Sequence, residues 1–240
     1  HATSPAVAEV AGQFDAMAER IEGLLAEQEE LFRSVNHELR TPIARMLFNL
    51  DLLEDGTEQE KEALRSELRS TTAEMRALTD ELLAFARLGH AAPPIDAEEV
   101  DLAELIEDIA ARWPSIDPET PAGPELVQGD SRLLFRALDN LASNADRYAD
   151  GGRIRLEHAP GWVHVLVEDH GPGIPVEARE RLFQPFARGE NSRSRETGGV
   201  GLGLAIVRRV AESHGGRVGV EENPPGGARL RLSLPRGHPL

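Results

Sequence analysis

The sequence predicts an α+β protein: a helical hairpin that dimerises into a four-helix bundle, followed by an α/β sandwich domain. Three observations favour this fold class. Apolar residues recur at helical spacing from Phe14 to Phe85, with one break near Gly56. Residues 89–94, Gly-His-Ala-Ala-Pro-Pro, are typical of a linker. Beyond them, short alternating segments mix with helical ones, which indicates helices packed on one face of a mixed sheet.

The first helix carries a seam of apolar and core-type residues spaced alternately by three and four, which is a heptad pattern. This pattern fits either a helix packed on its own domain or a parallel two-helix coiled coil. Dense flanking charge, as at Glu19, Arg20 and Glu22, favours the coiled coil and therefore a dimer. The seam consists of Phe14, Met17, Ile21, Leu24, Gln28, Leu31 and Val35, and continues through Leu39, Ile43, Met46 or Leu47, Leu50 and Leu53.

A break separates this helix from a second one. Pro42 removes a helical hydrogen bond, so we expect a kink just after His37. Gly56 is the expected C-terminal stop, and Thr57 is a candidate N-cap for the next helix. Two such helices joined by a short loop form an antiparallel hairpin. The apolar stripe of the second helix is Leu64, Leu68, Thr71 or Thr72, Met75, Leu78, Leu82 and Phe85.

After the linker, helices and strands alternate. The expected helices are residues 102–113, 132–148, 177–183 and 200–214, with Asp130 capping the second of them. The expected strands are residues 126–128, 153–157, 162–169, 217–221 and 228–234. A turn at Pro160-Gly161 makes 153–157 and 162–169 an antiparallel pair.

Composition excludes several classes of function. The 240 residues are 40% hydrophobic and 28% charged, which is typical of a folded chain of one or two domains. A net charge of −16 argues against a nucleic-acid surface, which needs clustered basic residues. The absence of cysteine excludes disulfides and thiolate metal sites. No apolar run approaches the ~20 residues that span a bilayer, and no signal peptide is evident, so we expect a soluble fragment.

One histidine lies off the heptad seam. His37 follows Val35 by two residues and should face water, with a carboxylate at Glu38 and a hydroxyl one helical turn on at Thr41. An imidazole, with a reference pKa of ~6.5, attacks phosphorus only through an unprotonated nitrogen, and Glu38 can accept the other ring N–H. By itself, a histidine on a coiled coil is more often a solvated surface residue.

Asn140 and Asn144 lie four residues apart on the helix 132–148 and share a face, with Arg147 nearby. An amide oxygen is a neutral, hard ligand that suits Mg²⁺. Taken alone, the pair is better explained as capping or surface amides.

Two glycine-containing segments follow on the same chain. Asp169 ends an apolar strand just before Gly171 and Gly173, so its carboxylate could meet an adenine amino group, or the segment could be an ordinary strand exit. Residues 198–204, Gly-Gly-Val-Gly-Leu-Gly-Leu, precede an apolar helix, whose N-terminus can bind phosphate. This is not the dinucleotide fingerprint, and it is not a Walker loop because no lysine follows.

The order of these signals is more specific than any one of them. The asparagine helix, the Asp-Gly-Gly turn, Phe183-Gln-Pro-Phe186, a polar loop and the glycine segment together resemble the ATP-binding domain shared by gyrase, the Hsp90 chaperones, histidine kinases and MutL. With His37-Glu38-Leu39-Arg40-Thr41-Pro42 and its helical prelude, the chain resembles sensor histidine kinases. The resemblance covers residues 14–234.

The resemblance implies a role for each matching residue. His37 is the phosphoacceptor, Glu38 takes up its proton, and Thr41 supports phosphatase activity. ATP and Mg²⁺ are the implied cofactors, and Asn144 is the Mg²⁺ ligand, with Asn140 in support. Asp169 recognises adenine, and Phe183 and Phe186 hold a lid over ATP. The implied nucleotide-binding residues are Asn140, Asn144, Arg147, Tyr148, Asp169, Gly171, Gly173, Phe183, Phe186, Arg188, Gly199, Gly201, Leu202 and Gly203.

The resemblance also implies a domain order and partners. Residues 1–26 are the end of a HAMP signal-relay module and a coiled-coil linker, 27–90 the dimerisation and histidine phosphotransfer domain, and 91–240 the catalytic ATP-binding domain. The expected partners are a second copy and the receiver domain of a response regulator, with no nucleic acid. A transmembrane helix and a sensor domain upstream would anchor the full-length protein on the cytoplasmic side of the bacterial inner membrane.

Two other functions are alternatives to the kinase. Related ATPases of the gyrase, Hsp90 or MutL kind place a glutamate general base one turn before the Mg²⁺ asparagine, where this chain has Asn140, and this argues against water as the acceptor. A scaffold without catalysis would be expected to lack one of His37, Asn144, Asp169 or the glycines, and this chain has them all.

Overall fold

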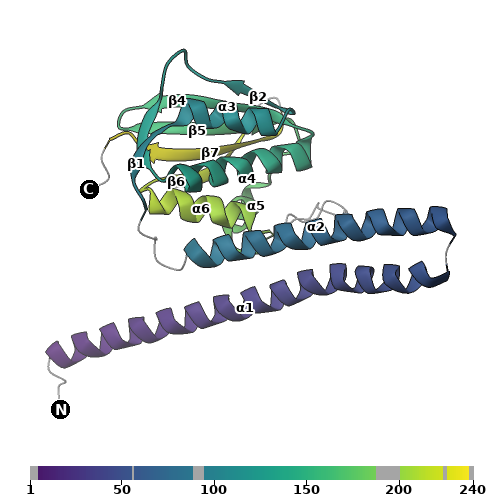
Figure 1. Cartoon of the computed structure of the whole chain (residues 1–240). Coiled ribbons are helices and arrows are strands. Elements are labelled where there is room, and N and C mark those ends of the chain that lie inside the picture. The colour runs from purple at the N-terminus through teal and green to yellow at the C-terminus, as the bar shows by residue number, and fades with distance from the viewer. Residues whose placement is uncertain (1–4, 56, 89–94, 188–200, 224–225, 238–240) are drawn as a thin grey trace. The chain divides into compact units, whose positions relative to one another are not determined.

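The computed structural model describes residues 5–55, 57–88, 95–187, 201–223 and 226–237 (Figure 1). The chain forms two compact units, residues 1–75 and 76–240. Two long helices open it, α1 (Pro5–Asp55) and α2 (Glu58–Leu88), and α1 continues as one helix through Pro42. Within these described ranges, no helix is both long and apolar enough to cross a membrane.

A capping box starts α2. The Thr57 hydroxyl accepts a hydrogen bond from the Glu60 N–H at 3.4 Å, and the Glu60 carboxylate accepts one from the Thr57 N–H at 2.7 Å. This reciprocal pair satisfies N–H groups that a helix start leaves without partners. The hydroxyl and N–H of Thr57 hold the pKa of Glu60 below its ordinary value. The cap predicted at Thr57 is confirmed, and α1 ends immediately before the stop predicted at Gly56, which lies outside the described residues.

The apolar seam of α1 is exposed over its first part. Phe14, Met17 and Ile21 are 71%, 58% and 44% exposed, while the side chains of Leu24 and Leu31 lie outside the described part of the chain. A row of exposed large apolar residues marks a surface that needs a partner.

Further along, the seam is exposed unevenly in the single chain. Leu39, Met46 and Leu53 are half-buried, whereas Ile43, Leu47 and Leu50 are 43%, 59% and 50% exposed. Residues three and four apart share one stripe of a helix. The exposed positions of this stripe are available to a further helix, and the single seam stays a prediction.

Two polar residues are buried in the first unit. Asn49 and Thr71 are 3% and 0% exposed, and the Asn49 side-chain nitrogen has no hydrogen-bond partner among the described residues. Across the hairpin, Arg45 pairs with Glu74 at 3.4 Å. The Thr72 hydroxyl lies 3.8 Å from Met46 Sδ, so a later residue of α1 meets an earlier residue of α2, and this order confirms the antiparallel hairpin.

The second unit is built on a five-stranded sheet with the order β2-β4-β5-β7-β6. β2 pairs in parallel with β4, and the remaining neighbours in this sheet are antiparallel. A separate two-stranded sheet pairs β1 with β3. The strands are β1 (Glu98–Asp101), β2 (Ile116–Glu119), β3 (Leu126–Gly129), β4 (Gly152–Ala159), β5 (Trp162–Asp169), β6 (Arg217–Glu222) and β7 (Ala228–Pro235).

Three helices cover one face of the large sheet: α3 (Leu102–Arg112), α4 (Ser131–Ala149) and α6 (Gly203–Ser213) (Figure 1). The core lies between them and the inward positions of the strands, where burial of apolar surface contributes about 25 cal/mol per Å². The outward strand positions are mostly charged, as expected of a sheet with one covered face. Core residues at 0–1% exposure include Leu102, Ile106, Leu138, Leu141, Val163, Val165, Val167, Ile206 and Leu232.

The mixed sheet with helices on one face was predicted correctly, including α3, α4 and the hairpin of β4 and β5. The short helix expected at 177–183 is two pieces, α5 (Val176–Arg179) and the 3₁₀ helix η1 (Arg181–Phe183). The helix expected from residue 200 begins at Gly203. Strands β1 and β2 were not predicted, because each has only four residues and the burial of neither alternates.

A buried histidine connects the end of α6 to the start of α4. His214 is 2% exposed; its Nε2 accepts the Asp130 N–H at 3.0 Å, and its Nδ1 lies 2.7 Å from the Val210 carbonyl oxygen. Asp130 in turn caps α4, since its carboxylate accepts the N–H groups of Arg132 and Leu133. Burial lowers the pKa of His214, against the opposing effects of Val210 and Asp130. The neutral ring of His214 therefore links the end of α6 to the start of α4.

This connection predicts a pH-dependent stability. Because the pKa of His214 is lowered on folding, the unfolded chain binds the proton more readily, and this histidine costs stability as the pH falls below about 6.5. In His214→Gln the lost stability should be largest near pH 8 and smaller near pH 5.5, changing by at most about 1.4 kcal/mol per pH unit. Urea unfolding followed by the fluorescence of Trp113 and Trp162 measures it.

The control variant is His37→Gln, whose histidine lies in the other unit and should leave this transition unchanged at both pH values. A stability loss in His214→Gln that is the same at pH 5.5 and pH 8 would contradict the role given to the neutral ring.

Candidate active site

His37 lies in the first unit on α1, and its side chain is 77% exposed. Glu38 follows it, with one carboxylate oxygen 3.6 Å from His37 Nδ1, which is ion-pair distance rather than hydrogen-bond distance. Thr41 is exposed one turn on, so that it shares the face of His37. The predicted exposure of His37 is confirmed.

In the second unit, α4 carries Asn140, Asn144, Arg147 and Tyr148. The Asn140 side-chain nitrogen donates to the Arg136 carbonyl oxygen at 2.9 Å, which leaves its oxygen directed away from that bond. The Asn144 amide is half-buried and has no hydrogen-bond partner in the described part of the chain. An amide in this position is available to a ligand.

The rotation of α4 is fixed from its far side. Trp113 Nε1 donates to the Asp139 carboxylate at 2.8 Å, and the Ser115 hydroxyl donates to the Asp146 carboxylate at 2.6 Å. Asp139 and Asp146 are seven residues apart and therefore share a helix face. Two anchors two turns apart hold the helix about its axis, and this sets the direction in which Asn144 points.

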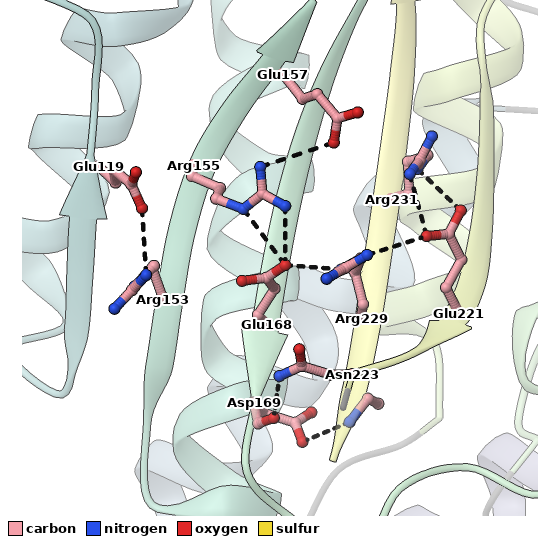
Figure 2. A network of polar contacts seen from close by, with 11 residues as sticks. Glu119, Arg153, Arg155, Glu157, Glu168, Asp169, Glu221, Asn223, Arg229 and Arg231 are labelled. Carbon is pink, nitrogen blue, oxygen red and sulfur yellow. Dashed lines mark hydrogen bonds and ion pairs between the residues drawn. The ribbon is translucent and has the colours of Figure 1, made fainter. Parts of the chain in front are cut away.

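Asp169 ends β5, and its carboxylate is held by backbone groups from two segments. Its Oδ1 accepts the N–H groups of Gly171 and Ala228, each at 2.9 Å. Its main-chain oxygen accepts a hydrogen bond from the Asn223 side chain at 2.8 Å (Figure 2). Among the described residues, Oδ2 of Asp169 has no hydrogen-bond partner.

Glycines allow close approach on both sides of α4. A Cβ on Gly203 would lie 2.8 Å from Asn140 Oδ1, and a Cβ on Gly171 would lie 3.1 Å from the Tyr148 carbonyl oxygen. The start of α6 and the exit of β5 therefore both meet α4. Gly173 lies beside the turn before β7, where a Cβ would be 3.2 Å from the Gly227 carbonyl oxygen.

The two described ends of the segment 187–201 also meet. Phe186 N–H donates to the Gly201 carbonyl oxygen at 2.9 Å, and both residues have positive φ, 62° and 74°. Phe183 and Leu202 are buried at 4% and 0% exposure. The predicted lid, residues 188–198, and the predicted nucleotide-binding Gly199 lie outside the described residues.

An ion-pair network ties the strands together next to Asp169 (Figure 2). Glu168 accepts from Arg155 on β4 at 3.1 Å and from Arg229 on β7 at 2.7 Å, and Glu221 on β6 pairs with Arg231 at 3.0 Å. Burial acts to raise the pKa of Glu168, but the two arginines outweigh it, so that its pKa lies below the ordinary value. The hydrogen bond with Glu168 raises the pKa of Arg155.

Three elements thus meet at one edge of the second unit: α4 with its two asparagines, the end of β5 at Asp169, and the start of α6 at Gly203. His37, Glu38 and Thr41 belong to the other unit. No group of three or more His, Cys, Asp or Glu side chains in the described ranges could hold a metal ion. The hard oxygen donors at this edge are amides and the carboxylate of Asp169.

Three residues at the site were missed by sequence reasoning: Asn223, Gly227 and Ala228, which contact Asp169 from the turn between β6 and β7. The available signal was the run Asn223-Pro-Pro-Gly-Gly227 between the expected strands 217–221 and 228–234. Nothing in the sequence indicates that this turn reaches past β7 to the end of β5.

Two family models match this chain. The family described as "His Kinase A (phospho-acceptor) domain" matches residues 27–91, which include His37. The family described as "Histidine kinase-, DNA gyrase B-, and HSP90-like ATPase" matches residues 129–238, which include Asn144 and Asp169.

Individual proteins agree with these families. Sensor protein RstB of Escherichia coli (strain K12) is 38% identical over 94% of this chain and 53% of its own. A solved structure of the catalytic domain of histidine kinase ThkA is 30% identical over 58% of this chain and 95% of its own, with a TM-score of 0.50. Full-length ShkA, solved in complex with AMPPNP, is 29% identical over 88% of this chain and 47% of its own, with a TM-score of 0.61.

The chain spans about half the length of the curated relatives it matches. The phosphoacceptor family covers the helical hairpin. The ATPase family follows it in the chain and covers the sheet and its helices. The chain therefore belongs to the family of sensor histidine kinases.

Proposed function

We propose that this chain is an ATP-dependent protein histidine kinase that phosphorylates itself on His37 and passes the phosphoryl group to an aspartate of a response regulator. One observation carries the proposal: the chain has both an exposed His37 next to Glu38 on a helical hairpin and, on a separate α/β unit, an edge lined by asparagine amides and the Asp169 carboxylate. The complex of the relative ShkA with AMPPNP supports a nucleotide at the second unit.

The nucleotide would lie along the edge formed by α4, the β5 exit and the start of α6. Asp169 would accept a hydrogen bond from the adenine amino group through Oδ2, since Oδ1 is occupied by two backbone N–H groups. The N-terminus of α6, approached through Gly201 and Gly203, would face the phosphates. Arg147, in the last turn of α4, would add positive charge near them.

Mg²⁺ fits this edge. The half-buried amide of Asn144, which has no hydrogen-bond partner among the described residues, offers the neutral hard oxygen that Mg²⁺ accepts, and Asn140 Oδ1 lies where a Cβ on Gly203 would collide. Asn144 would hold the ion, with Asn140 in support. When bound, the ion supplies charge neutralisation for phosphoryl transfer.

The chemistry at His37 follows from its neighbour. By closing from 3.6 Å to hydrogen-bond distance, Glu38 would accept the Nδ1–H of the ring, fix the tautomer and leave the lone pair of Nε2 to attack the γ-phosphoryl group. High exposure keeps the imidazole accessible to a donor on another unit. Since the two sites lie on separate units, transfer requires that the second unit bring its nucleotide to His37.

Several finer assignments belong to the same proposal. The exposed row of Phe14, Met17 and Ile21 supports a second copy as the partner, in a parallel dimer. Thr41 would place a water against a phosphorylated regulator and support phosphatase activity. In the full-length protein, a membrane anchor upstream would hold this portion on the cytoplasmic side of the bacterial inner membrane.

Water is the alternative phosphoryl acceptor, as in related ATPases. One turn before Asn144 stands Asn140, whose nitrogen is engaged with the Arg136 carbonyl oxygen and whose amide cannot act as a base. This observation favours the kinase over the ATPase.

The direct test of the proposal uses His37→Gln. This variant should incorporate no phosphate from γ-labelled ATP, yet bind ATP within about twofold of the wild type, because the nucleotide edge lies in the other unit. Label retention and isothermal titration measure the two properties. His158→Gln, at an exposed histidine of the second unit, is the control and should keep both; loss of ATP binding in His37→Gln would contradict the separation of the sites.

A second prediction concerns Asn144. Removing its amide in Asn144→Ala should lower phosphorylation by at least about tenfold and weaken its dependence on Mg²⁺, since a hard ligand is lost. Initial rates over a Mg²⁺ titration give the answer, with the adjacent Ser143→Ala as the matched control. An Asn144→Ala protein with the wild-type Mg²⁺ dependence would show that the metal ligand is elsewhere.

A further inference from the structure

Asn223 and Ala228, on the two sides of the turn between β6 and β7, both donate hydrogen bonds to Asp169. The Asn223 side chain is 8% exposed and donates to the Asp169 main-chain oxygen at 2.8 Å. Ala228 N–H donates to Asp169 Oδ1 at 2.9 Å, so one turn contacts both the backbone and the side chain of this residue (Figure 2).

Asp169 needs this support because it lies one residue beyond the ladder between β5 and β7. The last pair of that ladder is Glu168 with Arg229. Without a side chain reaching over from Asn223, the main-chain oxygen of Asp169 would have no partner on the β7 side. The Asn223 bond gives this oxygen a partner and so stabilises one orientation of the peptide.

The turn also fits closely against the β5 exit. A Cβ on Gly227 would lie 2.0 Å from the Asp169 main-chain oxygen, and Gly227 has a φ of 102°, so only glycine is accommodated here. Within the turn, Gly226 N–H donates to the Asn223 carbonyl oxygen at 2.8 Å, which closes the loop that delivers the Asn223 amide.

Next to Asp169, the Glu168 network fixes the register of the strands. Arg229 follows Ala228 directly and donates to Glu168 at 2.7 Å. Since Glu168 and Asp169 are neighbours, this bond holds the Ala228 N–H opposite the Asp169 carboxylate. β7 therefore carries both Arg229, which binds Glu168, and Ala228, whose N–H binds the Asp169 carboxylate.

We infer that Asn223, with Gly227 and Ala228, is a positioning element that sets base specificity: it holds Oδ1 of Asp169 on the protein, so that Oδ2 alone meets the nucleotide base. A carboxylate with one engaged oxygen accepts from an amino group and repels a carbonyl oxygen at the same place. The element thus selects a purine with an exocyclic amine at position 6. This inference rests on the proposed role of Asp169 in binding adenine.

The experiment measures the affinities of the whole chain for ATP, GTP and purine riboside triphosphate, which lacks the 6-amino group, by isothermal titration with Mg²⁺. The wild type should prefer ATP over the other two by about tenfold or more. Two variants, Asn223→Ala and the shape-matched Asn223→Asp, lack the N–H donor. Both should reduce this preference several-fold, mainly by weakening the affinity for ATP.

Two further variants separate the possible outcomes. Glu221→Gln removes the ion pairs of β6 with Arg229 and Arg231 but leaves the bond of Arg229 to Glu168 and the hydrogen bonds to Asp169 in place, and should lower the melting temperature while keeping the wild-type preference. Asp169→Asn tests the proposed function itself. If Asp169→Asn keeps the preference for ATP, the assignment of Asp169 to adenine is wrong.

If Asp169→Asn loses the preference and both Asn223 variants retain it, the inference is overturned while the proposed function stands. It is equally overturned if the Asn223 variants weaken all three nucleotides by the same factor, as a general loosening of the hairpin would. Tryptophan fluorescence confirms at each step that the second unit is folded.

Discussion

The orientation of α4 is the constraint on which the proposed nucleotide edge depends. Three separate connections hold this helix: Asp130 caps its start and is itself tied to His214, while Trp113 and Ser115 bind Asp139 and Asp146 on its far side. A helix anchored at one end and on one face cannot rotate without breaking hydrogen bonds. Its opposite face, with Asn140 and Asn144, is thereby kept in one place although neither asparagine is itself fixed by the sheet.

A second consequence concerns the division of chemistry between the units. The second unit holds its polar groups in place with many bonds, as at Asp169, where two N–H groups and one amide act on a single residue. His37 is instead 77% exposed, with a single carboxylate 3.6 Å away. In the account proposed here, the rigid unit orients the nucleotide and the exposed imidazole receives the phosphoryl group. Polar groups that position a charged nucleotide are expected to be held rigidly. A residue that receives the phosphoryl group from another unit is expected to be exposed.

Much of this organisation could be predicted from local patterns. The helix 132–148 and its cap at Asp130 follow from spacing and capping chemistry, and the pairing of β4 with β5 follows from alternation around a Pro-Gly turn. How far each position of the α1 stripe is buried could not be predicted, because Ile43 and Met46 satisfy the same spacing, yet Ile43 is 43% exposed and Met46 is half-buried. Asn223 was missed because its function comes from a contact with a residue 54 positions earlier in the chain, and local sequence carries no sign of such a contact.

The chemical stability of the phosphorylated residue shows directly whether His37 is the phosphoacceptor. After incubation with γ-labelled ATP and Mg²⁺, the label on the wild-type chain should be lost in acid, survive in base, and map to the peptide that contains His37. That stability distinguishes a phosphorylated imidazole from an acyl phosphate on Glu38, which base would cleave, and from an ester on Thr41, which acid would spare. A label that survives acid, or steady release of phosphate with no label on the chain, would contradict the account.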